Sequence, residues 1–159
     1  MRKVAAITAM LVLATPALGQ DLTALNGCYL ESSVAGTFLA AGDRQSQGSI
    51  GAGCDVAAGM VTIGGGIRAD WGDWTSGSLF GKAGLFVNPN LALYGLGEWR
   101  VRDWRIKDAG QLQLGAGVET TAFFNGISAF AEATTSVAKF GPSAARDDVL
   151  IRLGARYRF

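Results

Sequence analysis

The C-terminal segment of the chain alternates strictly between two kinds of side chain. From Val149 to Phe159 every odd position is apolar, whereas Arg152, Arg156 and Arg158 stand at even positions. Successive side chains of a β-strand point to opposite faces, so this pattern predicts a strand with one apolar and one charged face. Such a strand needs an apolar medium on one side and a polar one on the other.

The same period of two recurs along the chain, and glycines interrupt each of these segments. A helix would require a period near 3.6 and tolerates glycine poorly, so the pattern favours strands throughout. We predict eight strands of about 9–11 residues, a length that lets a tilted strand cross a bilayer. They lie near Cys28–Leu39, Ser49–Val56, Val61–Trp71, Leu79–Val87, Leu91–Arg102, Gln111–Ala122, Ile127–Val137 and Val149–Phe159.

The predicted connections between these strands alternate in length. Long outer loops and short inner turns are typical of bacterial outer-membrane barrels. Aromatic residues near both ends of the predicted strands predict two aromatic girdles. Those toward the long connections are Trp71, Trp74, Trp99 and Trp104, and those toward the short ones are Phe86, Phe123, Phe124, Tyr157 and Phe159. Long connections are expected at Ala41–Gln47, Gly72–Ser76, Asp103–Gly110 and Lys139–Asp148, and short ones at Ala57–Gly59, Asn88–Asn90 and Phe124–Gly126.

The N-terminus has the features of a secretory signal peptide. Arg2 and Lys3 precede a short apolar run, and Ala17-Leu18-Gly19 supplies small residues before a cleavage site at Gln20. We therefore predict a signal peptide over residues 1–19 and one barrel domain over residues 20–159.

Composition restricts what the exported chain can be. Charged residues make up only 17% and hydrophobic ones 49%, yet no apolar stretch after residue 19 could span a bilayer as a helix. Only helices and closed barrels satisfy every backbone group in lipid. The predicted fold is thus an all-β, eight-stranded, antiparallel up-and-down transmembrane β-barrel. Acidic and basic residues nearly balance, which gives no electrostatic case for binding nucleic acid.

Two cysteines, Cys28 and Cys54, would remain in the exported chain. Export implies an oxidising compartment, where a disulfide is the expected state. The two residues fall near the same end of neighbouring predicted strands. With two cysteines and no histidine, the sequence predicts neither a metal site nor a cofactor.

The polar faces of the predicted strands carry many charges. An eight-stranded barrel is only just wide enough for its own side chains, and buried charges must be paired. We therefore predict a network of salt bridges that closes the lumen; the alternative is a narrow porin-like channel for ions or small solutes. The residues expected to face the lumen are Glu31, Arg68, Asp70, Lys82, Glu98, Arg100, Glu119, Glu132, Arg152 and Arg156.

The last eight residues, 152–159, resemble the C-terminal signal of outer-membrane barrels, which ends in an aromatic residue. Gly154, Tyr157 and Phe159 match its main positions. The resemblance implies recognition by the barrel assembly machinery and a place in the bacterial outer membrane, among its lipid and lipopolysaccharide.

More broadly, the chain is similar to the small OmpA-like and opacity-protein-like barrels, the "porin family" surface antigens, whose Tyr-Gly pattern recurs at Leu93–Gly97. This resemblance implies a structural or surface-presenting role, with no external partner identified. Outer-membrane barrel enzymes resemble one another in needing a catalytic histidine, which this chain lacks, so we predict no enzyme. A soluble periplasmic barrel of lipocalin type, with its apolar face inside, is the rival interpretation.

Overall fold

A computed structural model describes residues 25–38, 44–72, 75–102, 110–124, 126–139 and 149–159. The predicted signal peptide lies outside these residues. The described chain forms eight strands: β1 (Gly27–Phe38), β2 (Arg44–Ala58), β3 (Val61–Gly72), β4 (Ser76–Asn88), β5 (Leu91–Arg102), β6 (Gln111–Phe124), β7 (Ile127–Lys139) and β8 (Val149–Arg158).

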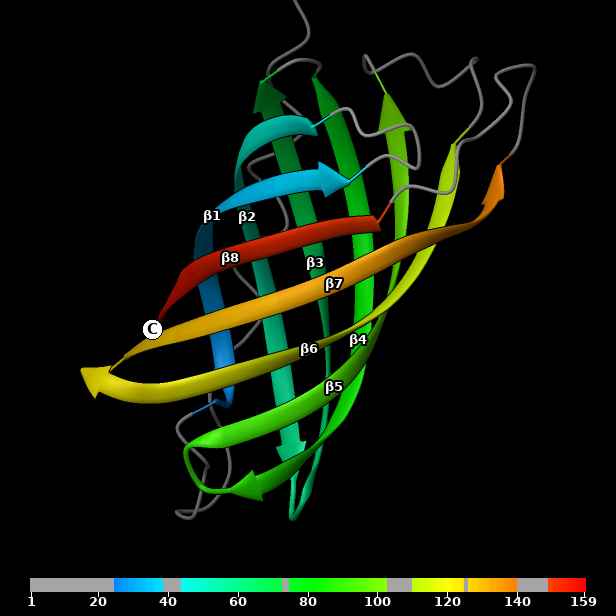
Figure 1. Cartoon of the computed structure of the whole chain (residues 1–159). Helices are drawn as coiled ribbons and strands as arrows, with labels where there is room; N and C mark the ends of the chain where they lie inside the picture. The colour runs from blue at the N-terminus through cyan, green and yellow to red at the C-terminus, as the bar shows by residue number, and fades with distance from the viewer. Residues whose placement is uncertain (1–24, 39–43, 73–74, 103–109, 125, 140–148) are drawn as a thin grey trace, which may run out of the picture.

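Each strand pairs antiparallel with its neighbour in sequence, and β8 pairs with β1 to close the barrel (Figure 1). The predicted all-β, eight-stranded, antiparallel fold is therefore confirmed. The strands span 10 to 15 residues, and all of them except β8 exceed the predicted length. The largest difference is in β2, which begins at Arg44 inside the connection expected at Ala41–Gln47. Its glycines and serines gave no clear alternation there.

The two ends of the barrel differ in their connections. One rim, called here the turn end, holds the tight turns after β2, β4 and β6, together with the last residue, Phe159. Gly59 and Gly126 adopt positive φ of 61° and 79° in two of these turns, a conformation that glycine reaches without steric cost. The opposite rim, the loop end, holds the connections after β1, β3, β5 and β7.

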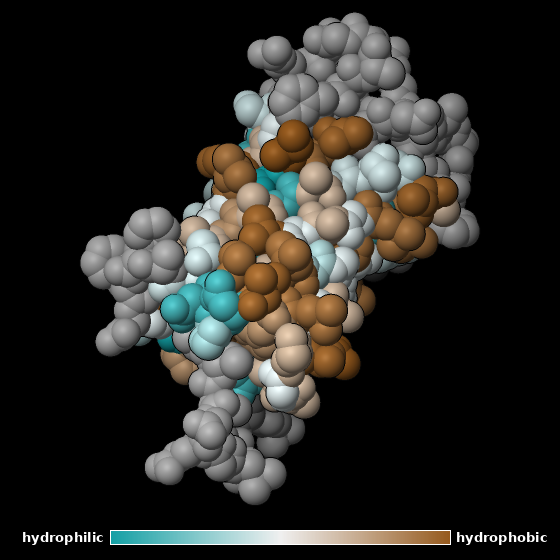
Figure 2. Space-filling model, turned by 60° about the horizontal axis from the view of Figure 1, so that its bottom comes forward, coloured by the Kyte–Doolittle hydropathy of each residue, from teal (hydrophilic) through white to brown (hydrophobic). Residues whose placement is uncertain are grey.

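The side chains of the wall divide cleanly between two faces. In β8 the exposed residues are Val149, Ile151, Leu153, Ala155 and Tyr157, and the arginines between them are buried. Apolar residues cover much of the wall visible in Figure 2, with residues of intermediate hydropathy between them. Most of the large aliphatic side chains of the barrel thus face outward. Among the described residues, none belongs to a helix with the length and hydropathy needed to span a membrane.

The aromatic girdles are only partly as expected. Trp71, Trp99, Tyr157 and Phe159 are exposed on the outer wall. Phe86 instead points inward and is buried with Leu25 and Ala92, so its assignment to a girdle was wrong. Phe86 stands at an even position of β4, and the even positions of this strand point inward. The girdle assignment considered only that Phe86 is near a turn. The remaining expected girdle members, Trp74, Trp104 and the side chains of Phe123 and Phe124, lie outside the described residues.

Candidate functional site

Charged side chains fill the interior of the barrel. Among the described residues, six carboxylates and six cations are buried there, each at most 7% exposed. Burying an unpaired charge costs far more than the fold can offset, so each must find a partner inside the wall. The carboxylates are Glu31, Asp55, Asp70, Glu98, Glu119 and Glu132, and the cations are Arg68, Lys82, Arg100, Arg152, Arg156 and Arg158.

The charges near the loop end form the first group. The guanidinium of Arg100 lies 2.8 Å from Glu98, and the guanidinium of Arg152 lies 3.2 Å from both Asp70 and Glu98. Ser76 Oγ donates a hydrogen bond to Asp70 at 2.9 Å. Each carboxylate of this group therefore contacts two arginines or more.

The central group is built around Glu31 and Glu132. Arg156 Nε lies 2.9 Å from Glu31 and its Nη2 lies 2.8 Å from Glu132, while Arg68 on β3 contacts the same two carboxylates. The hydroxyl of Tyr94 donates to Glu132 at 2.9 Å. Four charges from four strands thus share one hydrogen-bonded cluster.

The third group lies toward the turn end. Lys82 Nζ is 3.0 Å from Asp55 and 3.1 Å from Glu119, and Arg158 contacts the same two carboxylates. Contacts of Arg156 with Glu119 and of Arg68 with Glu98, the latter at 3.4 Å, join this group and the loop-end group to the centre. The twelve side chains form one continuous network.

Every charged residue that the sequence predicted for the lumen lies inside the barrel within this network. Asp55 and Arg158 belong to it as well but were absent from the predicted set. Parity would have found both, because Asp55 follows the outward Cys54 and Arg158 precedes the outward Phe159.

Aromatic side chains occupy the interior space that the charges leave. Each of four inward aromatic rings lies over a glycine directly opposite it on the next strand. A Cβ on any of these glycines would lie 2.6 to 2.9 Å from the ring, closer than real Cβ contacts. The pairs are Tyr29 with Gly53, Phe80 with Gly66, Tyr94 with Gly117, and Phe130 with Gly154.

The rings also bind the cations of the network. The Arg68 guanidinium lies 3.9 Å from the centre of the Phe80 ring, and that of Arg156 lies 4.0 Å from the centre of Phe130. Cation–π contacts gain strength when the cation is desolvated, as it is here. Rings and charges therefore pack as one interior.

We expect Gly117→Ala to destabilise the barrel by about 1–3 kcal/mol, because its Cβ would lie 2.6 Å from the Tyr94 ring and force the interior apart. Gly81→Ala is the matched control, since a Cβ there meets no atom closer than 4.0 Å. Urea unfolding of both variants checks this expectation. Equal midpoints for the two alanine variants would contradict it.

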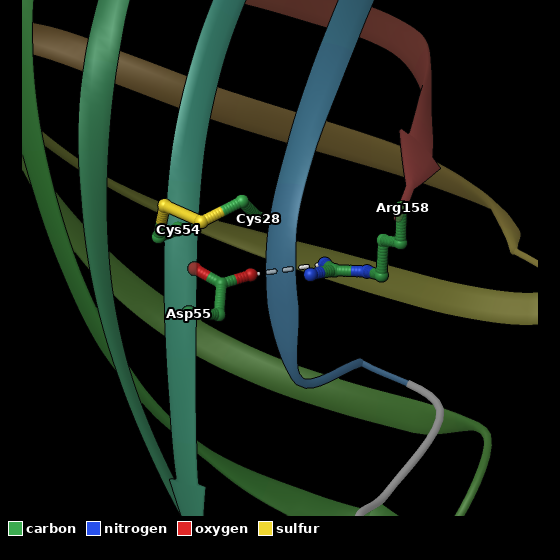
Figure 3. Close-up of a disulfide and its surroundings, with 4 residues drawn as sticks. All are labelled: Cys28, Cys54, Asp55 and Arg158. Carbon is green, nitrogen blue, oxygen red and sulfur yellow. Dashed lines mark hydrogen bonds and ion pairs between the residues drawn. A yellow bond between two sulfur atoms is a disulfide. The ribbon is translucent and has the colours of Figure 1, made fainter. Parts of the chain in front are cut away.

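The two cysteines form a disulfide, as predicted. Cys28 on β1 stands directly opposite Cys54 on β2, and their sulfurs are bonded (Figure 3). Asp55, the next residue, points into the barrel and contacts Arg158 at 2.9 Å. The backbone N–H of Phe159 donates to the carbonyl of Cys28 at 3.1 Å. The bond therefore lies where β2, β1 and the end of β8 meet.

Replacing both cysteines by serine is expected to lower the free energy of unfolding by about 3 kcal/mol, because the bond restrains the unfolded chain between residues 28 and 54. The measurement is the urea midpoint of the double variant and of the wild type, each with and without reductant. Reductant should lower the midpoint of the wild type alone. An unchanged wild-type midpoint after verified reduction would contradict the expectation.

The residues of the predicted assembly signal divide between the two faces. Tyr157 and Phe159 are 56% and 67% exposed on the outer wall at the turn end. Gly154 instead lies beneath Phe130 in the interior. The structure thus places two aromatic residues of the signal where another molecule could contact them.

The buried carboxylates of the described residues are held by cations. Each of the six carboxylates contacts at least two cations, including Asp70 and Glu119, which also accept hydrogen bonds from the hydroxyls of Ser76 and Ser128. Within the described part of the chain, no group of three histidine, cysteine or acidic residues is placed to hold a metal ion. The interior of the described barrel is therefore packed, and its buried positive and negative charges are equal in number.

No protein-family profile matches the sequence, and no curated protein matches it. Solved structures do resemble the fold. One described as "De novo design of transmembrane beta-barrels" superimposes with a TM-score of 0.56 at 12% identity, covering 82% of this chain and 95% of that one. A second, the solution NMR structure of the de novo designed TMB2.3, gives 0.49 at 14% identity, covering 84% and 96%. The first likeness supports a transmembrane-type barrel fold.

Proposed function

We propose that the chain is a non-enzymatic outer-membrane protein with a structural or surface-presenting role, whose lumen is closed by its charge network. The observation that carries this proposal is the distribution of side chains between the two faces. Twelve charges lie inside, while large apolar residues such as Ile63, Leu79 and Leu153 are more than half exposed outside. This is the reverse of a soluble ligand-binding barrel and fits a wall in contact with hydrocarbon.

The outer membrane is the membrane we propose, with its lipid and lipopolysaccharide as surroundings. Support comes from the outward aromatic residues Tyr157 and Phe159 at the end of β8, which suit recognition by the barrel assembly machinery. Cell fractionation tests the location. Recovery in an outer-membrane fraction, in a form whose gel mobility changes on heating, is expected; recovery in the soluble periplasm would refute the proposal.

The closed lumen is tested by conductance across planar bilayers. Because the network is continuous and includes bulky rings such as Phe80 and Phe130, the purified barrel is expected to give no steady single-channel steps. Steady steps in the wild type would favour the alternative, a narrow porin-like channel for ions or small solutes. An Arg68→Ala variant, which removes a central cation, provides the control for detecting an opened path.

A further inference from the structure

We propose that the three arginines of β8 select the register in which the barrel closes, by neutralising carboxylates that the other strands hold in excess. The described inward carboxylates lie on β1, β2, β3, β5, β6 and β7, and β8 has none. The cations divide equally: Arg68, Lys82 and Arg100 lie on β3, β4 and β5, and the other three lie on β8.

All six carboxylates contact an arginine of β8. Arg152 reaches Asp70, Glu98 and Glu132; Arg156 reaches Glu31, Glu119 and Glu132; and Arg158 reaches Asp55 and Glu119. Each of the six also contacts at least one of the three cations on β3 to β5. Every carboxylate is thus bound both from β8 and from the opposite part of the wall.

Before β8 docks, the inward face of the other strands carries unbalanced charge. Among the side chains that the structure describes, the inward face of β1–β7 then holds six carboxylates and three cations, an excess of three negative charges, and β8 carries three positive ones. A strand of complementary charge is attracted to such a face, and the attraction is screened by salt.

Alternation of apolar and polar residues does not fix the register of β8 completely, and the spacing of its arginines supplies the missing information. A slip of one residue would turn the arginines outward, but a slip of two leaves every side chain on its proper face. Shifted by two, an arginine would occupy the place of Gly154, where a Cβ would lie 2.7 Å from the Phe130 ring. The arginines would also leave the carboxylates they now contact. The spacing of Arg152, Gly154, Arg156 and Arg158 therefore disfavours both slipped alignments.

The first test compares two variants that lose the same contacts. Arg158 on β8 and Lys82 on β4 both bind Asp55 and Glu119. Arg158→Gln lowers the positive charge of β8, whereas Lys82→Gln raises the excess negative charge on the inward face of β1–β7. Refolding rates are measured in uncharged detergent micelles between about 0.01 and 0.1 M salt, over which the Debye length falls from about 30 to about 10 Å.

We expect salt to slow refolding about threefold in the wild type, about fourfold in Lys82→Gln and about twofold in Arg158→Gln, following the product of the two charges. Unfolding rates should change less. Equal salt dependence in the two variants, or the reverse order, would overturn the proposal. A salt-independent refolding rate in the wild type would overturn it even if neither variant folds.

The second test reads the register directly, in a background with serine at Cys28 and Cys54. Ser32 on β1 stands opposite Ala155 on β8, so Ser32→Cys with Ala155→Cys reports the native alignment. Ser32→Cys with Leu153→Cys reports a slip of two residues. Adding Arg158→Gln is expected to raise the slipped cross-link severalfold, and adding Lys82→Gln is not. A slipped fraction that rises equally with both substitutions would indicate a general loss of stability and refute register selection.

Discussion

Replacing Arg156 with methionine is expected to cost about 3–5 kcal/mol of stability, because three buried carboxylates lose a cation at once. Arg156 contacts Glu31, Glu119 and Glu132, and its guanidinium also lies over the Phe130 ring. Methionine keeps much of the side-chain volume of arginine. The loss of stability therefore measures the effect of removing the positive charge and its hydrogen bonds. The measurement is the free energy of unfolding in urea, in detergent micelles or lipid vesicles.

A second substitution separates charge imbalance from lost packing. Arg156→Met combined with Glu132→Gln restores equal numbers of buried positive and negative charges, so the double variant is expected to be more stable than Arg156→Met alone. Removing one partner of a buried ion pair is costly mainly because the other charge remains. A loss below about 1 kcal/mol for Arg156→Met would mean that the network contributes little to holding the barrel together.

Placing an arginine at Ile67 is expected to destabilise the barrel by about 2–4 kcal/mol in a bilayer, the cost of a charge near the centre of the lipid-facing wall. Ile67 lies in the middle of β3 and is 53% exposed. In a soluble barrel the same change would replace one exposed side chain by another and would alter stability by less than about 0.5 kcal/mol. Urea unfolding in vesicles of a zwitterionic lipid provides the measurement.

Val61→Arg is the matched control for this prediction. Val61 lies on the same face of the same strand but at its turn end, and it is 43% exposed. At the membrane interface an arginine costs only about 0–1 kcal/mol. A large difference between the two variants is expected for a membrane barrel, whereas near-neutral results at both positions would support the soluble alternative.

The sequence was sufficient to predict most of the strands and their two faces, because alternation is a local property that needs no knowledge of neighbours. It failed at the start of β2, where Arg44 to Gln47 show no clear alternation. The disulfide followed from two exported cysteines on neighbouring strands. The inward charges followed from the same parity, although Asp55 and Arg158, which share that parity, were left out of the predicted lumen set.

The pairing of side chains across strands was beyond sequence reasoning. Which glycine lies beneath which ring depends on register, and the stagger between strands is fixed only when the barrel closes. The opposition of Tyr29 to Gly53 and of Phe130 to Gly154 could therefore not be read from either strand alone. The sequence also misplaced Phe86, since nearness to a turn does not decide whether a side chain points in or out.

Because β1 and β8 are paired neighbours, the order of the strands along the chain can be permuted. A Cβ at Gly27 would lie 3.6 Å from the carbonyl oxygen of Phe159, so the first and last strands end side by side at one rim. A short linker from residue 159 to residue 27, with new termini at the Gly59–Met60 turn, would preserve every strand pairing. In such a circular permutant β8 would no longer be the last strand, although the finished ring would be the same.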